Sequence, residues 1–84
     1  RRKHRRPRGF AAPSAERARL DTLLERAQTL YDADQAAEAL QLLESNLNRF
    51  GQFAPLRAAL ATLYGTLGRF NEAAAQARIA LDLD

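Results

Sequence analysis

Few side chains of this sequence can carry acid–base, nucleophilic or metal chemistry near neutral pH. There is no cysteine, which excludes disulfides, zinc–thiolate sites and thiol nucleophiles and is compatible with a reducing compartment. The one histidine, His4, lies among arginines, whose charge favours a neutral, solvated imidazole over a base or a metal ligand. Neither Ser14 nor Ser45 has the glycine-flanked context of a nucleophilic serine. We therefore expect no enzymatic activity, no metal and no cofactor.

The positive charge is concentrated at the N-terminus. Residues 1–8 hold six cations and no acid, whereas residues 9–84 hold seven cations and ten acids, a net charge of −3. The six cations are Arg1, Arg2, Lys3, Arg5, Arg6 and Arg8. Such a cluster can attract an anionic membrane surface, mark the cytoplasmic side of a preceding membrane span, or neutralise nucleic-acid phosphates. The acidic remainder, and an arm in which Phe10 is the one aromatic residue, count against nucleic acid. The order of preference is therefore the membrane, then an inert solvated tail, then nucleic acid.

Residues 1–13 are expected to be a flexible arm, because two prolines, a glycine and no sustained apolar period leave little surface to bury. A helix is expected from Ser14, a good N-cap residue, with Glu16 in the first turn, where the helix dipole favours an acid. No apolar run approaches the roughly 18 residues of a membrane span, and the N-terminus lacks the apolar stretch of a signal peptide. We expect a soluble cytoplasmic chain, with an anchoring membrane segment upstream left open.

The elements that position any site are predicted to be helices. Apolar residues at helical spacing indicate a first segment from residue 14 to about residue 33 and a second over residues 36–50. The short polar turn between them permits only antiparallel neighbours, and Gly51 is expected to end the second segment. The predicted buried faces are Leu20, Leu23, Leu24, Ala27, Leu30 and Tyr31, then Ala36, Ala39, Leu40, Leu43, Leu47 and Phe50.

Two further helical segments are predicted in the second half. Pro55 fits the first turn of the third segment, Gly68 ends it, and Phe70 opens the fourth. The predicted apolar faces are Leu56, Leu60, Leu63, Tyr64 and Leu67, then Ala73, Ala74, Ala77, Ala80 and Leu81. Because valine is absent and isoleucine occurs once, no strand is expected. The predicted fold class is all-α, with about four antiparallel helices over residues 14–84.

The two halves repeat each other with a period of 34 residues. At this offset four pairs are identical: Ala27 with Ala61, Glu38 with Glu72, Ala39 with Ala73, and Leu47 with Leu81. Each half also keeps a helix, a tight turn and a second helix. The repeating units are therefore residues 20–53 and residues 54–84.

The period and the residues of the second unit resemble those of the tetratricopeptide repeat. Leu60, Ala61 and Tyr64 match the leucine, small and tyrosine positions of the first helix in that family. Gly68 and Phe70 match the turn glycine and the aromatic residue that opens the second helix. The first unit departs further from the pattern. The departures are Arg26, Leu30, Asp34 and Gly51 in the first unit and Arg57 and Ala77 in the second.

The resemblance implies an α-solenoid fragment whose concave groove binds a peptide or helix of another protein. The matching groove positions are Leu24, Gln28, Tyr31 and Asp32 in the first unit and Ala58, Thr62, Gly65 and Thr66 in the second. Leu24 and Tyr31 can grip an apolar side chain, or Tyr31 can pack between the units. Gly65 can allow a close backbone approach or relieve crowding between helices.

The implied function is a protein–protein interaction scaffold. A scaffold that carries this basic arm suggests the cytoplasmic part of a membrane-anchored assembly factor. The excess of arginine over lysine suggests a bacterial source. The alternative is binding of an anionic membrane surface or nucleic acid by the arm. Repeat arrays usually need three or more units to bury a continuous core. The alanine-rich last segment therefore predicts a further repeat, a capping helix or self-association with a second subunit against Ala74, Ala77 and Leu81.

Overall fold

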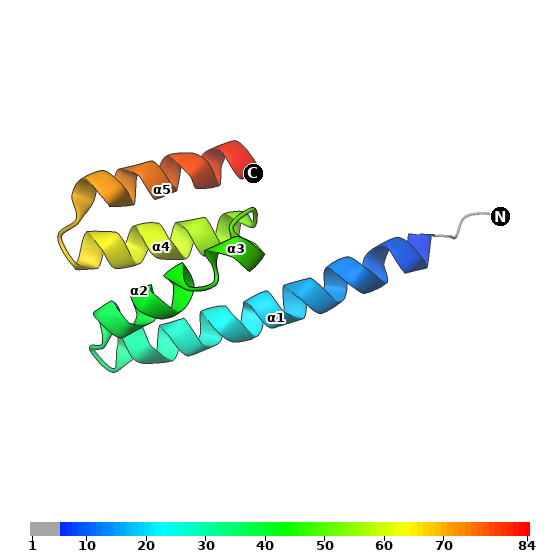
Figure 1. Ribbon diagram of the computed structural model, residues 1–84, viewed down its shortest axis with the longest axis horizontal. Coiled ribbons are helices and arrows are strands. Elements are labelled where there is room, and N and C mark those ends of the chain that lie inside the picture. The colour runs from blue at the N-terminus through cyan, green and yellow to red at the C-terminus, as the bar shows by residue number, and fades with distance from the viewer. Residues whose placement is uncertain (1–5) are drawn as a thin grey trace.

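The computed structural model describes the backbone of residues 6–84 and the side chains of residues 15–84. In this part of the chain there are five helices and no strand: α1 (Arg6–Asp32), α2 (Ala36–Glu44), α3 (Leu47–Phe50), α4 (Ala54–Thr66) and α5 (Phe70–Leu83). α1 packs on α2, α2 on α4 and α4 on α5, so these helices follow one another across the molecule (Figure 1). The predicted all-α class is confirmed.

The turns of the two helix–turn–helix units, α1–α2 and α4–α5, close in the same way 34 residues apart. Asp34 has a φ of 65° in the first turn and Gly68 a φ of 80° in the second, both in the left-handed region. In each turn the next residue donates its backbone N–H to the carbonyl five residues earlier, at 2.8 Å. These bonds satisfy carbonyls that a helix end leaves free. Aspartate tolerates a left-handed conformation better than most residues, so the first turn forms without glycine.

The hydrophobic core lies between α1, α2 and α4, with Phe50 of α3 closing one end. Its buried side chains are Leu20, Leu23, Ala27, Ala39, Leu40, Leu43, Phe50, Leu56, Leu60, Leu63 and Tyr64. The prediction that Leu67 is buried is wrong, since Leu67 is 38% exposed in the turn after α4. Tyr31, predicted on the apolar face of its helix and also as a groove residue, is 37% exposed because it borders a groove described below.

The outer helices of the array differ in polarity. The face of α1 opposite its buried leucines is polar, and Asp21, Thr22, Glu25, Arg26 and Thr29 are all exposed there. α5 contributes no buried residue to the core. Its exposed side chains are apolar on one side, as at Phe70 and Leu81, and charged elsewhere, as at Arg78 and Asp82.

The predicted start of the first helix is wrong, since α1 begins at Arg6 and not at Ser14. Residues 6–13 are helical instead of forming part of a flexible arm, and residues 1–5 lie outside the described residues. Pro7 lies in the first helical turn, where its missing N–H would have no partner anyway. Pro13 removes one hydrogen bond inside α1, which alanine and arginine neighbours with high helix propensity help to offset. This N-terminal part of α1 extends beyond the other helices (Figure 1).

The segment predicted as one helix over residues 36–50 is divided into α2 and α3. The Ser45 hydroxyl and the Asn46 side-chain amide both donate to the carbonyl of Leu42, each at 2.9 Å. These side chains compete for the carbonyl that the backbone N–H of a continuing helix would use. Gly51 ends α3 as predicted, and a side chain there would collide with the carbonyl oxygen of Leu47.

Candidate protein-binding groove

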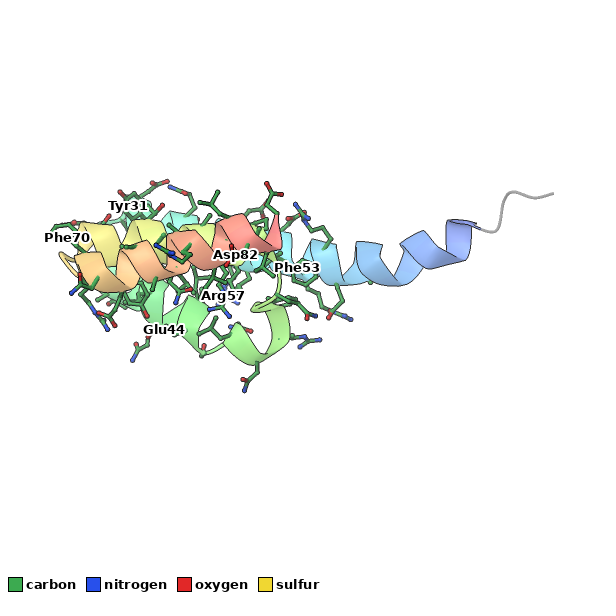
Figure 2. The ribbon with its side chains drawn as sticks, turned by 90° about the horizontal axis from the view of Figure 1, so that it is seen from above. Tyr31, Glu44, Phe53, Arg57, Phe70 and Asp82 are labelled. Carbon is green, nitrogen blue, oxygen red and sulfur yellow. The ribbon has the colours of Figure 1, made fainter. Side chains whose placement is uncertain are left out.

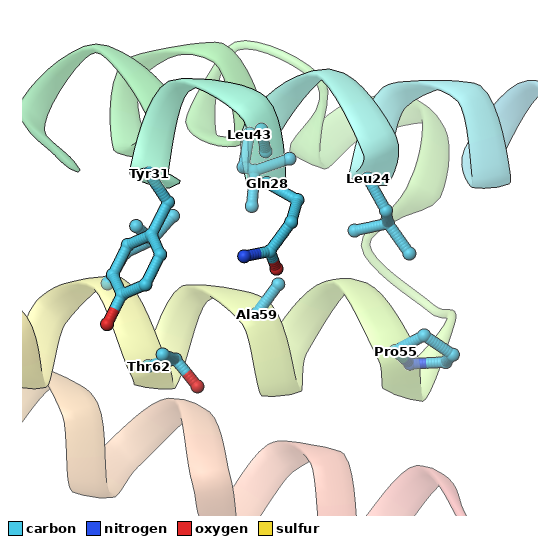
Figure 3. A pocket seen from close by; sticks show the side chains of 9 residues that line it. Leu24, Gln28, Tyr31, Leu43, Pro55, Ala59 and Thr62 are labelled. Carbon is cyan, nitrogen blue, oxygen red and sulfur yellow. The ribbon is translucent and has the colours of Figure 1, made fainter. Parts of the chain in front are cut away.

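A groove runs between α1 and α4, the first helices of the two units. Its central hollow has a volume of about 270 Å³. Ala27, Leu43 and Leu63 form an apolar floor that belongs to the core. The other lining residues are Leu24, Gln28, Tyr31, Pro55, Ala59 and Thr62 (Figure 3). The hollow therefore combines an apolar floor with polar groups at its rim, which is the usual composition of a binding site.

Four of the predicted groove residues line this hollow: Leu24, Gln28, Tyr31 and Thr62. Three of them lie on α1 and one on α4, and a tight turn, two short helices and a loop separate these helices in the sequence. Only the packing of α1 beside α4 brings the four residues together. The first three follow the spacing i, i+4, i+7, which places them on one side of α1. Thr62 lies on the facing side of α4 (Figure 3).

Pro55 and Ala59 also line the hollow, although the sequence did not predict them as groove residues. They precede Thr62 by seven and three residues, so Pro55, Ala59 and Thr62 repeat on α4 the spacing found on α1. Helical spacing counted back from Thr62 towards the start of α4 would have predicted both residues.

Tyr31 and Thr66 face each other across the end of the groove. Their hydroxyl oxygens lie 3.5 Å apart, and the Thr66 hydroxyl is also 3.0 Å from the carbonyl of Thr62. A hydroxyl has one hydrogen, and the shorter contact with the carbonyl uses it. The Thr66 oxygen is then left as an acceptor for the Tyr31 hydroxyl, and the Tyr31 oxygen keeps lone pairs that can accept a hydrogen bond from a bound segment. Figure 3 shows the Tyr31 ring reaching from α1 towards α4 beside Thr62.

The other three predicted positions lie differently. The side-chain amide of Gln28 donates to the carboxylate of Asp32 at 2.8 Å, so Asp32 orients the rim amide from outside the hollow. Ala58 lines a separate hollow between α4 and α5. A side chain at Gly65 would meet nothing within 4 Å, so the prediction that this glycine relieves crowding between helices is wrong. Its role in a close approach by a partner stays a prediction.

A polar cluster joins the two units on another side of the molecule. The Tyr64 hydroxyl, on a side chain only 7% exposed, donates to the carboxylate of Glu44 at 2.5 Å. The Arg69 guanidinium lies 4.8 Å from the centre of the Tyr64 ring and donates twice to Glu72, at 2.7 and 2.6 Å. The bond to Glu44 and burial raise the pKa of Tyr64 to about 12, while the bond from Arg69 lowers the pKa of Glu72. Because α2, α4 and the start of α5 all contribute, the cluster ties the second unit to α2 of the first unit.

Arg57 ties the loop before α4 to α5. Its Nε donates to the carbonyl of Gly51 at 2.7 Å, and its Nη1 donates to the side-chain oxygen of Gln76 at 3.0 Å.

The basic arm lies mostly outside the described part of the chain. Arg1, Arg2, Lys3 and Arg5 belong to the residues that the structure leaves out, and only the backbone of Arg6 and Arg8 is described. Binding of an anionic surface by these residues stays a prediction. Among the side chains of residues 15–84, no group of three or more histidines, cysteines, aspartates or glutamates is arranged to hold a metal ion. None of the described helices combines the length and apolar character needed to cross a membrane.

No family model, curated protein or solved structure matches this chain. The resemblance to the tetratricopeptide repeat therefore rests on the matched residues and on the 34-residue period, which the two turns repeat in their backbone conformation.

Proposed function

We propose that this chain is a tetratricopeptide-like interaction module that binds a segment of another protein in the groove between α1 and α4. The observation that carries the proposal is the convergence of Leu24, Gln28 and Tyr31 with Thr62 on one hollow. The sequence pattern predicts these same four residues as partner-binding positions.

The groove suits a peptide segment better than a free small molecule. Its volume of about 270 Å³ lies just below the range of roughly 300–1,000 Å³ that is usual for small-molecule pockets. One large apolar side chain of the partner would occupy the floor, where burial gains about 25 cal/mol per Å². The amide of Gln28 and the hydroxyls of Tyr31 and Thr62 would pair with the partner backbone on either side of that anchor.

The proposal includes a scaffolding role in the bacterial cytoplasm, beside a membrane. The six cations of residues 1–8 support this setting, because each basic residue near an anionic bilayer surface contributes roughly 1 kcal/mol of attraction. In this arrangement the arm holds the chain at the surface and the groove selects the protein that is assembled there.

The test is a comparison of captured proteins from a cell lysate, read by mass spectrometry. The groove variant is Tyr31→Ala/Thr66→Arg, and the matched control is Gln41→Ala, an exposed residue on α2 outside the groove. We expect one specific protein to be lost with the groove variant and retained with the control. That protein is then produced alone, and its dissociation constant is measured for all three chains.

Salt distinguishes the groove from the arm. An apolar contact in the groove should persist from low to moderate salt, whereas binding through the six cations should weaken steeply. Equal capture by the groove variant and the control, with loss only when residues 1–13 are removed, would instead establish binding of lipid or nucleic acid by the arm.

A further inference from the structure

The outer surface of α5 carries an exposed apolar stripe. Phe70 is 70% exposed and Leu81 is 78% exposed, and Ala74 and Ala77 between them are also exposed. Their spacing of i, i+4, i+7 and i+11 places all four on one side of the helix. Phe70 lies at the start of α5 and Asp82 near its end, so the stripe runs along nearly the whole helix (Figure 2).

The internal repeat shows that this stripe corresponds to a face that is covered in the first unit. The positions 34 residues earlier are Ala36, Leu40, Leu43 and Leu47, of which Leu40 and Leu43 are buried and the other two pack against the core. α4 covers that face, whereas no described element covers the stripe on α5. Beside the stripe, alanines of α4 and α5 leave a hollow of about 580 Å³.

We propose that a second copy of this chain covers the stripe, with the two α5 helices antiparallel about a twofold axis between Ala74 and Ala77. In this register Phe70 of each copy lies level with Leu81 of the other, and Ala74 lies level with Ala77. The two large side chains therefore meet at each end, and the small ones meet at the centre, where they let the helix axes approach closely. The spacing of the stripe is that of a two-helix seam.

Charge favours the same orientation. Asp82 and Asp84 lie at the C-terminal end of α5, where the helix dipole disfavours acids. In the antiparallel pair they lie beside the first turn of the other helix, where the dipole favours acids. Arg69 and Glu72 in that turn already balance each other as an ion pair. The stripe therefore complements a second copy of itself in side-chain size, and the helix dipoles favour the antiparallel orientation.

The expected pair is weak. α5 has 14 residues and is about 21 Å long, so two such helices bury less than the roughly 1,200–2,000 Å² of a standard interface. We expect a concentration-dependent equilibrium between monomer and dimer, measured by sedimentation of the full chain from micromolar to millimolar concentration. A chain that stays monomeric throughout this range, or that forms dimers in which α5 is uncovered, would overturn the proposal.

Matched arginine variants locate the interface. Ala75 and Ala77 are both exposed alanines of α5, but only Ala77 belongs to the stripe. Ala77→Arg brings two like charges together near the twofold axis and should raise the dimer dissociation constant at least about 100-fold. Ala75→Arg should leave it unchanged. Circular dichroism checks that both variants keep their helices, and equal effects of the two substitutions would contradict the proposal.

Cysteine variants test the register, since the natural chain has no cysteine. Within one chain, residues 70 and 81 are about 16 Å apart along α5, too far for a disulfide. Phe70→Cys/Leu81→Cys should give a covalent dimer on mild oxidation, and an equal mixture of Phe70→Cys and Leu81→Cys chains should give the mixed dimer. Neither single variant should crosslink to itself. Self-crosslinking of either one would mean a different pairing and would reject this register.

Discussion

Tyr64 shows at the level of a single residue how the two units are held together. Its buried hydroxyl in α4 donates to Glu44 of α2, and its ring lies beneath Arg69 at the start of α5. A hydrogen bond to a charged group typically contributes about 1.5–3 kcal/mol to stability. The sequence predicts Tyr64 on the apolar face of its helix, but the carboxylate that accepts its hydrogen bond comes from the other unit.

This bond predicts loss of stability at alkaline pH. The bond to Glu44, together with burial, raises the pKa of Tyr64 to about 12 in the folded chain, whereas an unfolded tyrosine has a pKa near 10. The unfolded chain therefore loses this proton first, and its stabilising effect is present below pH 10 and lost as the pH rises to about 12. We expect the free energy of unfolding to fall by up to about 3 kcal/mol over this window in denaturant titrations.

Two variants check the assignment of this effect. Tyr64→Phe should lose the part of the pH dependence that comes from Tyr64, whereas Tyr31→Phe, at an exposed position, should keep it. An unchanged pH profile in Tyr64→Phe would contradict the role of the bond to Glu44.

The two left-handed turn residues predict substitutions of opposite sign. Asp34→Gly should stabilise the chain by about 0.5–1 kcal/mol, because glycine adopts a positive φ without the clash of a side chain. Gly68→Ala should destabilise it by about 1 kcal/mol for the converse reason. Thermal and denaturant unfolding measure both. Shifts of the same sign would show that the turns do not share the conformation described for them.

At the level of elements, sequence periodicity predicted most of the helices. The 34-residue period and the turn signals place the end of α1 and both ends of α4 within about two residues, and α5 begins at Phe70 as predicted. The division of α2 from α3 was missed because Ser45 and Asn46 act through hydrogen bonds to one carbonyl, which an apolar pattern does not record. The start of α1 at Arg6 was not predicted, because Pro7 and Pro13 are residues that usually interrupt a helix.

The groove could be predicted only in part for a similar reason. Positions on one helix face, such as Leu24 and Tyr31, follow from spacing alone. Ala58 faces α5 instead, because the rotation of α4 about its axis depends on packing against three neighbours. A sequence pattern shows which residues share one face of a helix. It does not show which neighbouring helix each of those residues contacts.

Gly65 gives a prediction for α4 as an element. Because a side chain there would meet nothing within 4 Å, Gly65→Ala should raise the free energy of unfolding by about 0.5–1 kcal/mol through helix propensity. The affinity of the same variant for the partner tests the remaining interpretation, which is a close approach of the partner backbone at Gly65. Unchanged affinity would reject a close backbone approach at this position, whereas a loss of affinity together with a gain in stability would support it.

At the scale of the whole molecule, the core is shared between the units. Leu20 of α1 and Leu60 of α4 are both fully buried in one cluster. We expect Leu20→Ala and Leu60→Ala each to lower the free energy of unfolding by about 2–5 kcal/mol and to shift one common transition. Circular dichroism and tyrosine fluorescence should give the same midpoint in each variant. Two separate transitions would mean that the units fold independently.

The polar outer face of α1 limits how large an assembly of this chain can grow. A chain that stacked its α1 on the α5 of the next molecule would present a fresh α5 each time and would polymerise into an open-ended filament. Such stacking would bury Glu25, Arg26 and the Arg17–Asp21 ion pair against alanines, where these charges would lose their hydration. In the proposed antiparallel pairing, assembly would therefore end at a closed dimer, and the polarity of α1 would oppose fibre formation.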